Sequence, residues 1–152
     1  MFNLDRIVVP TDFSDYSDHA LKRALDLAEA CEAKIYLTYV APDAPDIFKL
    51  SKYVVEGQEK IKAELEKRCA EYFQKQIAMF PQAEKVEIET NVFTGSPYKE
   101  ILDFQKKIKA DMVVIGTHGE TPFEGFFFGS TSQKIIRHSI CSVMIVRKPM
   151  YS

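Results

Sequence analysis

Two glycine-containing segments in the later part of the chain carry the strongest local sign of chemistry. Residues 116–119 read Gly-Thr-His-Gly, and after nine further residues, residues 129–132 read Gly-Ser-Thr-Ser at the start of a predicted helix. Because glycine has no side chain, it lets backbone amides approach a phosphate closely, and a helix N-terminus adds unpaired N–H donors and a favourable dipole. The two segments therefore indicate a site for a phosphate-bearing ligand.

The same residues also have purely structural interpretations. Ser130, with Gln133 three residues later, matches a capping box that would start a helix without any ligand, and taken alone this tetrapeptide favours plain capping. Paired glycines can simply turn a strand into a loop. A Walker A loop is excluded because no Lys-Ser or Lys-Thr follows a glycine at the required spacing, and no Gly-x-Gly-x-x-Gly follows the first strand.

Strands and helices alternate in the sequence pattern. Short apolar runs predict strands at residues 4–10, 35–40, 112–115 and 143–146, and an alternating pattern predicts one at residues 86–91. Apolar residues three to four apart predict helices at residues 14–32, 49–80, 97–109 and 130–138. The chain is too short for a closed eightfold barrel, so this order predicts an α/β fold, an open five-stranded parallel sheet with helices on both faces. We expect one domain spanning residues 1–152.

Several element boundaries have their own signals. Ser14 is a predicted N-cap, and Pro97 after Ser96 is typical of a first helical position. The long helix begins either near Lys49 or after Gly57, and residues 41–57 are predicted to be loosely structured, as a flap over a site would be. The alternation of polar and apolar residues in 86–91 indicates a strand near an edge of the sheet.

Composition excludes several classes of function. Hydrophobic residues make up 46% of the 152 residues, enough for one core, and 20 basic against 22 acidic residues give no reason to expect nucleic acid or an anionic membrane as partner. No apolar run reaches the roughly 20 residues that span a bilayer, and the start lacks a secretory pattern. Cys31, Cys69 and Cys141 form no disulfide or zinc pattern, so we expect a cytoplasmic protein with free thiols.

Two predicted loops leave the carboxyl ends of strands. Pro10, Thr11 and Asp12 end the first strand, and the loop at Gly116 ends the fourth. In an open parallel sheet, ligands bind beyond the carboxyl ends of the strands. If these two strands are neighbours, both loops face one crevice.

With these motifs, the chain resembles the universal stress protein family over nearly its whole length. The resemblance rests on residues 9–14, 95–97 and 137–143, and on the pattern Gly-x2-Gly-x9-Gly-Ser/Thr of the family's ATP-binding members. Gly116, Gly119, Gly129 and Ser130 fill that pattern with both spacings correct. The resemblance implies a Rossmann-like fold of the adenine nucleotide alpha-hydrolase-like type with strand order 3-2-1-4-5, which places strands one and four side by side.

The resemblance also implies a nucleotide site with two ends. At the adenosine end Asp12 would accept hydrogen bonds from adenosine and the backbone of Val40 would read adenine, beside Pro10 and Thr11. The residues implied for ribose and phosphates are Gly116, His118, Gly119, Gly129, Ser130 and Thr131, and we add Ser132 because its hydroxyl and amide can donate to phosphate oxygens. The alternative interpretation of Asp12 is a turn residue.

The implied cofactor is ATP with Mg²⁺ held through its phosphates. Glu120 and Glu124 stand where similar proteins often carry Lys or Arg, and two carboxylates oppose a triphosphate unless Mg²⁺ intervenes or they face solvent. A less charged nucleotide such as AMP is therefore the alternative. His118 is interpreted as a hydrogen-bonding residue, since no Ser, Cys or carboxylate is paired with it in the sequence.

Three functions remain open from the sequence. The first is a regulatory module that binds a nucleotide, with at most slow hydrolysis and no catalytic residues, because no general base or arginine finger is recognisable. The second is a homodimeric interaction protein that does not bind ATP appreciably. The third, a nucleotidyl transferase or pyrophosphatase, lacks the HIGH-type and SGGxDS-type motifs. The family pairs its apolar last strand across a two-fold axis, so the resemblance implies a homodimer through residues 143–146.

Overall fold

The computed structural model of the chain describes residues 1–42, 54–117 and 129–148, with side chains from residue 59 onward in the second range. The strands of this part of the chain form one sheet in which every neighbouring pair is parallel. Their order is β3-β2-β1-β4-β5, which confirms the predicted topology and makes β1 and β4 neighbours. The strands are β1 (Arg6–Pro10), β2 (Lys34–Ala41), β3 (Ile88–Thr94), β4 (Met112–Gly116) and β5 (Ser142–Val146).

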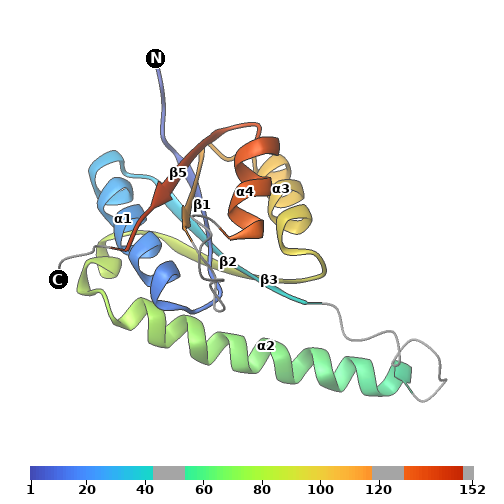
Figure 1. The fold of residues 1–152 in the computed structure, drawn as a ribbon. Helices are drawn as coiled ribbons and strands as arrows, with labels where there is room; N and C mark the ends of the chain where they lie inside the picture. Colours follow the sequence, from blue (N-terminus) through green and yellow to red (C-terminus); the bar gives the residue numbers. More distant parts are fainter. Residues whose placement is uncertain (43–53, 118–128, 149–152) are drawn as a thin grey trace.

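Helices cover both faces of the sheet (Figure 1). One face is covered by α1 (Asp15–Cys31) and α2 (Val54–Ala78), and the other by α3 (Pro97–Ile108) and α4 (Ser130–His138). A short 3-10 helix, η2 (Pro81–Lys85), follows α2.

Each face of the sheet has its own hydrophobic core. Successive strand residues point to opposite faces, so in β1 the side chain of Ile7 packs with Leu21 of α1, whereas Val8 packs with Ile135 of α4. All four side chains are completely buried. A strand that is buried on both faces needs the continuous apolar sequence that predicted β1.

The third strand differs from its prediction. It was expected at residues 86–91, but β3 begins at Ile88 and continues to Thr94, where it still pairs with Ala41 of β2. Pro81 starts the η2 turn, and Val86 ends it with an extended backbone, so residues 81–87 are used before pairing begins. β3 lies at one edge of the sheet, as the alternation of its residues indicated.

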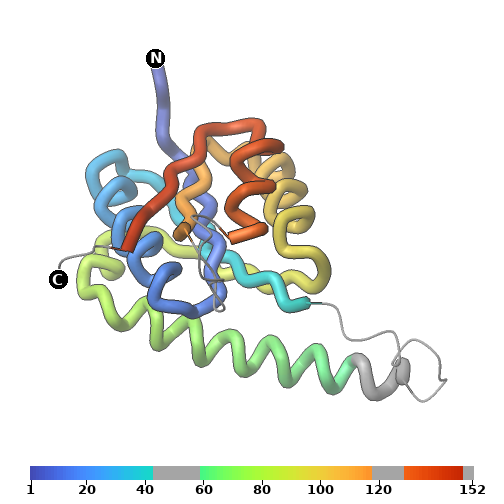
Figure 2. Tube along the Cα trace, in the orientation of Figure 1, coloured from blue at the N-terminus to red at the C-terminus, as the bar shows by residue number. Residues whose placement is uncertain are grey.

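Helix α2 is anchored by its second half. It begins at Val54, between the two predicted starts, and ends at Ala78 rather than Phe80. Cys69, Phe73 and Gln76 are buried, whereas Ile61 is 57% exposed. The Cα trace shows the coloured part of α2 continuing past the sheet on the N-terminal side of these buried residues (Figure 2).

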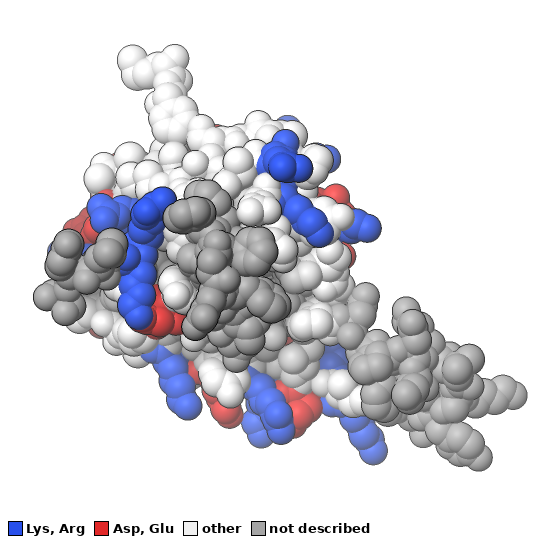
Figure 3. Space-filling view, viewed as in Figure 1, with Lys and Arg blue, Asp and Glu red and all other residues white. Residues whose placement is uncertain are grey.

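The surface and the thiols agree with the composition. Acidic and basic side chains are interspersed along α2 on the face shown in Figure 3. All three cysteines are free, and burial raises the pKa of the Cys69 thiol. Within the described ranges, no helix combines the length and the apolar character needed to cross a membrane.

Candidate functional site

The topology brings the carboxyl ends of β1 and β4 together at one end of the sheet. β1 ends at Pro10, and its neighbour β4 ends at Gly116. Val40 is the penultimate residue of β2, on the other side of β1. The carboxyl ends of β1 and β4 mark the switch point at which the order of the parallel strands reverses. Ligands bind at this point in folds of this type.

The residues predicted from the sequence are distributed over four elements at this end of the sheet. Pro10, Thr11 and Asp12 end β1, Val40 and Gly116 lie near the ends of β2 and β4, and residues 129–132 begin α4. His118 and Gly119 lie outside the described residues, as do Glu120 and Glu124. Of the segment 41–57 that was expected to be loosely structured, residues 43–53 also lie outside them, whereas Ala41 ends β2 and residues 54–57 are the start of α2, so the prediction was wrong there.

Asp12 has the turn role that was its alternative interpretation. Its Oδ1 accepts hydrogen bonds from the Ser14 amide at 3.1 Å and from the Ser14 hydroxyl at 2.5 Å. The hydroxyl of Ser14 in turn caps α1 by accepting from the Ser17 amide, which confirms the predicted N-cap. Among the described residues, Oδ2 of Asp12 has no donor, so one carboxylate oxygen is committed to the turn and the other can accept from a ligand.

The residue after Asp12 has an unusual backbone. Phe13 has a φ of 62°, in the left-handed region, which costs a non-glycine residue about 1–3 kcal/mol and persists only when its surroundings impose it. The Phe13 amide donates to the Thr11 hydroxyl at 3.0 Å. The Phe13 ring lies 5.0 Å from that of Tyr39, 5.3 Å from that of Tyr72 and 5.1 Å from that of Phe73, between centroids.

The start of α4 contradicts the capping-box interpretation of Ser130. The N-cap is Gly129, which makes no side-chain cap, and Ser130 is already the first helical residue. The helix begins at Ser130, as predicted, but its cap is Gly129, whose amide donates to the Thr117 carbonyl at 2.6 Å and whose carbonyl accepts from the Gln133 amide at 3.1 Å. The first-turn amides of α4 therefore lack a side-chain acceptor from within the described part of the chain.

The hydroxyl side chains of α4 differ in their surroundings. Ser130 is exposed and Thr131 is half-buried. Ser132 is buried, and its hydroxyl donates to the Gly116 carbonyl at 2.9 Å. That bond ties α4 to the end of β4 and uses the hydroxyl hydrogen of Ser132, so its backbone amide is the donor that a ligand could still receive.

Gly116 has a packing reason to be glycine. A Cβ atom on this residue would lie 2.9 Å from the backbone oxygen of Tyr16 in the first turn of α1. Since backbone cannot move aside cheaply, only glycine lets α1 approach β4 this closely. The close approach holds the N-terminus of α1 beside the carboxyl end of β4.

A charge pair lies at the start of α1. The ammonium of Lys148, which follows β5, pairs with the carboxylate of Asp15. The hydrogen bond from Lys148 lowers the pKa of Asp15, and the same bond raises the pKa of Lys148. Both groups are exposed, so solvent screens the pair.

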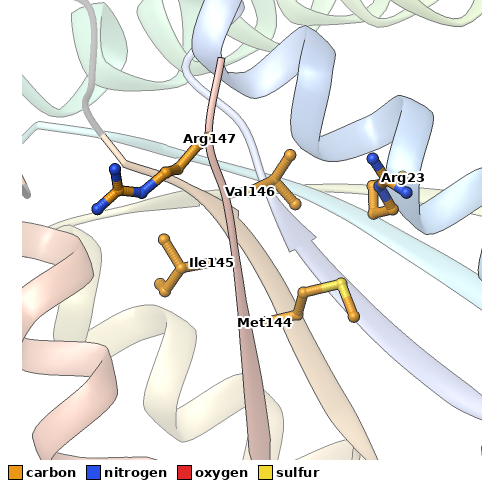
Figure 4. Close-up of a pocket in the computed structure, with 5 residues that line it drawn as sticks. All are labelled: Arg23, Met144, Ile145, Val146 and Arg147. Atoms are coloured by element: carbon orange, nitrogen blue, oxygen red, sulfur yellow. The ribbon is translucent and has the colours of Figure 1, made fainter. Parts of the chain in front are cut away.

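A separate pocket lies beside β5 rather than between β1 and β4. Its cavity volume is about 360 Å³, and it is lined by Arg23, Met144, Ile145, Val146 and Arg147. Met144 and Val146 point toward Arg23 on α1, whereas Ile145 and Arg147 point to the opposite side of the strand (Figure 4). β5 is the outermost strand of the sheet, so this pocket lies at its edge.

Comparison with known proteins identifies the family. The profile described as "Universal stress protein family" matches residues 3–147. The chain belongs to the universal stress protein family. It is 34% identical over 144 residues to universal stress protein MJ0531 of Methanocaldococcus jannaschii, covering 95% of this chain and 82% of that one.

Solved structures share the fold of this universal stress protein domain. The hypothetical protein MJ0577 has a TM-score of 0.79 at 21% identity, covering 95% of this chain and 96% of its own. A universal stress protein in complex with cAMP has a TM-score of 0.65 at 24% identity, with coverage of 95% and 98%. One from Archaeoglobus fulgidus in complex with dAMP has a TM-score of 0.63 at 19% identity, with coverage of 96% and 99%.

Sequence reasoning missed one buried polar residue of this universal stress protein that contacts the candidate site. Gln76 of α2 is 3% exposed and contacts the segment that follows β1. The signal was a polar residue in the same helical stripe as Cys69 and Phe73, a position where a buried amide needs partners.

Proposed function

We propose that the crevice between the carboxyl ends of β1 and β4 binds an adenine nucleotide, ATP with Mg²⁺, and that the protein acts as a nucleotide-responsive regulatory module. One observation carries the proposal: the N-terminus of α4 has a glycine N-cap and is tied to the end of β4, next to the loop that holds Asp12. Unsatisfied amides and the helix dipole at this place favour a phosphate.

Each end of the crevice has a separate role in the proposal. At the adenosine end, Oδ2 of Asp12 accepts hydrogen bonds from adenosine, and the backbone of Val40 contacts adenine, flanked by Pro10 and Thr11. The proposed ribose and phosphate ligands are Gly116, His118, Gly119, Gly129, Ser130, Thr131 and Ser132. The complexes of two structural neighbours with cAMP and dAMP support an adenine nucleotide as the ligand class.

Magnesium enters through the phosphates in this proposal. The described residues contain no group of three or more His, Cys, Asp or Glu side chains that could hold a metal ion. Mg²⁺ commonly keeps several waters and binds through substrate phosphates, so a protein cage is not required. Its chemistry here is to neutralise phosphate charge.

The proposal is tested by identifying what the protein carries. Nucleotides are extracted from freshly purified, heat-denatured protein and identified by mass spectrometry, and ATP and AMP are then titrated into nucleotide-free protein with Mg²⁺. We expect ATP in the extract and a dissociation constant below about 1 mM. AMP in place of ATP would revise the ligand, and an empty extract with binding weaker than millimolar for both would overturn the proposal.

A homodimer is the second candidate function, as an interaction module. β5 is an edge strand, and its Val143, Met144 and Ile145 remain partly exposed beside the pocket of Figure 4. An apolar edge strand is normally paired or covered, and a second copy can pair with it. Sedimentation at micromolar protein tests this: we expect a dimer that Ile145→Lys dissociates, and a monomeric wild type would contradict it.

The expectations about turnover and location stay proposals. At most slow ATP hydrolysis is proposed, measured as phosphate release from the purified protein. The proposed location is the cytoplasm, since all three cysteines are free thiols, which is typical of a reducing compartment.

A further inference from the structure

A buried glutamine connects α2 to the loop that carries Asp12. The side-chain oxygen of Gln76 lies 3.0 Å from the Thr11 hydroxyl and accepts its hydrogen, which that hydroxyl shares with the Ser17 hydroxyl, also at 3.0 Å. Its amide nitrogen donates to the Asp18 carboxylate at 2.8 Å and to the Ser17 hydroxyl at 3.3 Å. Both ends of the carboxamide are therefore used on one short segment, residues 11–18, although α2 lies far away in the sequence.

The contact continues from Gln76 to the residues on both sides of Asp12. The Thr11 hydroxyl that donates to Gln76 also accepts from the Phe13 amide at 3.0 Å. The Thr11 amide donates to the Thr38 carbonyl of β2 at 2.9 Å. Asp12 thus lies between two residues whose positions depend on the Thr11 hydroxyl, and its carboxylate direction is set by the Ser14 amide.

A second and independent contact joins the same two segments. The Phe13 ring is stacked on Tyr72 and meets Phe73 edge-on, and both of these residues belong to α2. Since Phe13 has the strained φ of 62°, packing against α2 helps to hold a conformation that the residue would not otherwise adopt. The loop is therefore shaped by α2 through polar and aromatic contacts together.

We propose that Gln76 is a positioning residue of the nucleotide site: from α2 it fixes Thr11 and Phe13, and through them the carboxylate of Asp12. This inference rests on the proposed function, because it assigns Asp12 to the ligand. It places the adenosine end under the control of α2, while the phosphate end at α4 depends on other contacts. A change at Gln76 should thus weaken adenosine recognition and leave phosphate recognition unchanged.

The test compares two glutamines on the same helix. Gln76→Leu removes the carboxamide and keeps a similar volume, and Gln74→Leu makes the same change at an exposed position, as a matched control. The first readout is amide hydrogen exchange at Phe13 and Ser14 without nucleotide. The second is the affinity for AMP, ATP and inorganic triphosphate, measured on folded protein well below its unfolding temperature.

We expect exchange at Phe13 and Ser14 to become about tenfold faster in Gln76→Leu, because the hydrogen bonds that order the loop are weakened. AMP and ATP should both bind about tenfold more weakly, the factor that one hydrogen bond of this kind is worth. Triphosphate affinity should not change, and Gln74→Leu should match the wild type. A variant that is merely less stable would not separate AMP from triphosphate.

Each other outcome overturns the inference. Unchanged exchange at Phe13 and Ser14 means that Gln76 does not order the loop. Faster exchange with unchanged AMP affinity means that the loop does not position the site. A wild type that binds no nucleotide fails at the proposed function itself, and it is recognised as such before any variant is compared.

Thr11→Val and Thr11→Ser keep the inference testable if Gln76→Leu does not fold. Thr11→Val removes the hydroxyl that links Gln76 to Phe13, and Thr11→Ser restores it. We expect Thr11→Val to speed Phe13 exchange and weaken AMP binding about as much as Gln76→Leu, and Thr11→Ser to recover both. Where both single variants fold, their double variant should lose no more affinity than either alone, because both break one chain of contacts. Fully additive losses would contradict the inference.

Discussion

The two ends of the proposed site, the loop after β1 and the start of α4, are built in different ways. In the loop after β1 the side chains of Thr11, Asp12 and Ser14 all have protein hydrogen-bond partners, and α2 packs on the loop from outside. At the start of α4 the cap is a glycine with no side-chain bond. The first region is shaped by contacts within the protein, whereas the first-turn amides of the second have no side-chain acceptor among the described residues.

In the proposed site, this difference predicts which contribution to binding each end makes. A loop that is already ordered costs little conformational entropy on binding, and it can select one ligand shape over another. Open amides at a helix N-terminus attract any phosphate through charge and hydrogen bonds. Selectivity for adenosine should therefore come from the β1 loop, and most of the dependence on phosphate charge from α4.

The largest effect on the free energy of unfolding is expected at Gly116, the last residue of β4. Gly116→Ala places a Cβ against the Tyr16 backbone, so we expect a loss of about 1–3 kcal/mol in the free energy of unfolding. Urea denaturation measures it. Gly129→Ser is the control, because φ −67° and ψ 158° suit any residue there, and it should be close to neutral. Equal losses in both variants would contradict the packing argument.

The adenosine end is tested by Asp12→Ala. AMP and ATP should lose affinity by the same factor, about tenfold, because both share the adenosine that Asp12 would contact. Stability should fall by about 1 kcal/mol, since the Ser14 amide loses its acceptor. Isothermal titration and urea denaturation give the two numbers, with the exposed Asp103→Ala as control. A loss for ATP alone would place Asp12 at the phosphate end instead.

The phosphate end is tested by a change whose two effects have opposite signs. Gly129→Asp supplies a capping side chain and, unlike Gly129→Ser, also places a negative charge at the positive end of the helix dipole, so stability should rise by about 0.3–1 kcal/mol. The same carboxylate occupies the amides and repels phosphate, so ATP affinity should fall more than adenosine affinity. Thermal unfolding and titration are compared in one preparation. Higher stability with unchanged ATP affinity would mean that the start of α4 is only structural.

The smallest effect is expected from the charge pair outside both ends. Asp15 has a pKa lowered from 3.8, so its contribution is present above that value and is lost as the pH falls through the lowered pKa. Lys148 has a pKa raised from 10.5, so its contribution is present below that value and is lost as the pH rises through the raised pKa. Lys148→Met should lower the urea midpoint slightly at about pH 7 and not at about pH 2. The same small deficit at both values would argue against the ion pair.

Most of the fold could be predicted because its signals are local. The apolar runs of β1 and β4 and the spacing of α1 are read within single segments, and the order of elements then leaves few topologies. The position of β3 was less predictable, since Pro81 begins a 3-10 turn and the strand is extended by pairing with β2. Pairing between distant segments leaves no local trace in the sequence.

The site was predictable only in part, for a similar reason. The residues at the ends of β1 and β4 could be placed at one edge once the strand order was known. The cap of α4 could not, because a bond from Gly129 to Thr117 moved it by one residue. Gln76 escaped notice because its partners, Thr11 and Asp18, lie on another element and are brought to it only by packing.

The central claim is that one crevice binds a nucleotide through both of its ends. Amide resonances of ¹⁵N-labelled protein, followed while ATP and Mg²⁺ are added, test that claim directly. We predict changes concentrated in residues 11–14 and 129–132, saturating together below about 1 mM ATP. Resonances at the amino ends of the strands, such as those of Asp111 and Cys141, should not shift. No change up to that concentration, or changes confined to the amino ends of the strands, would contradict the account.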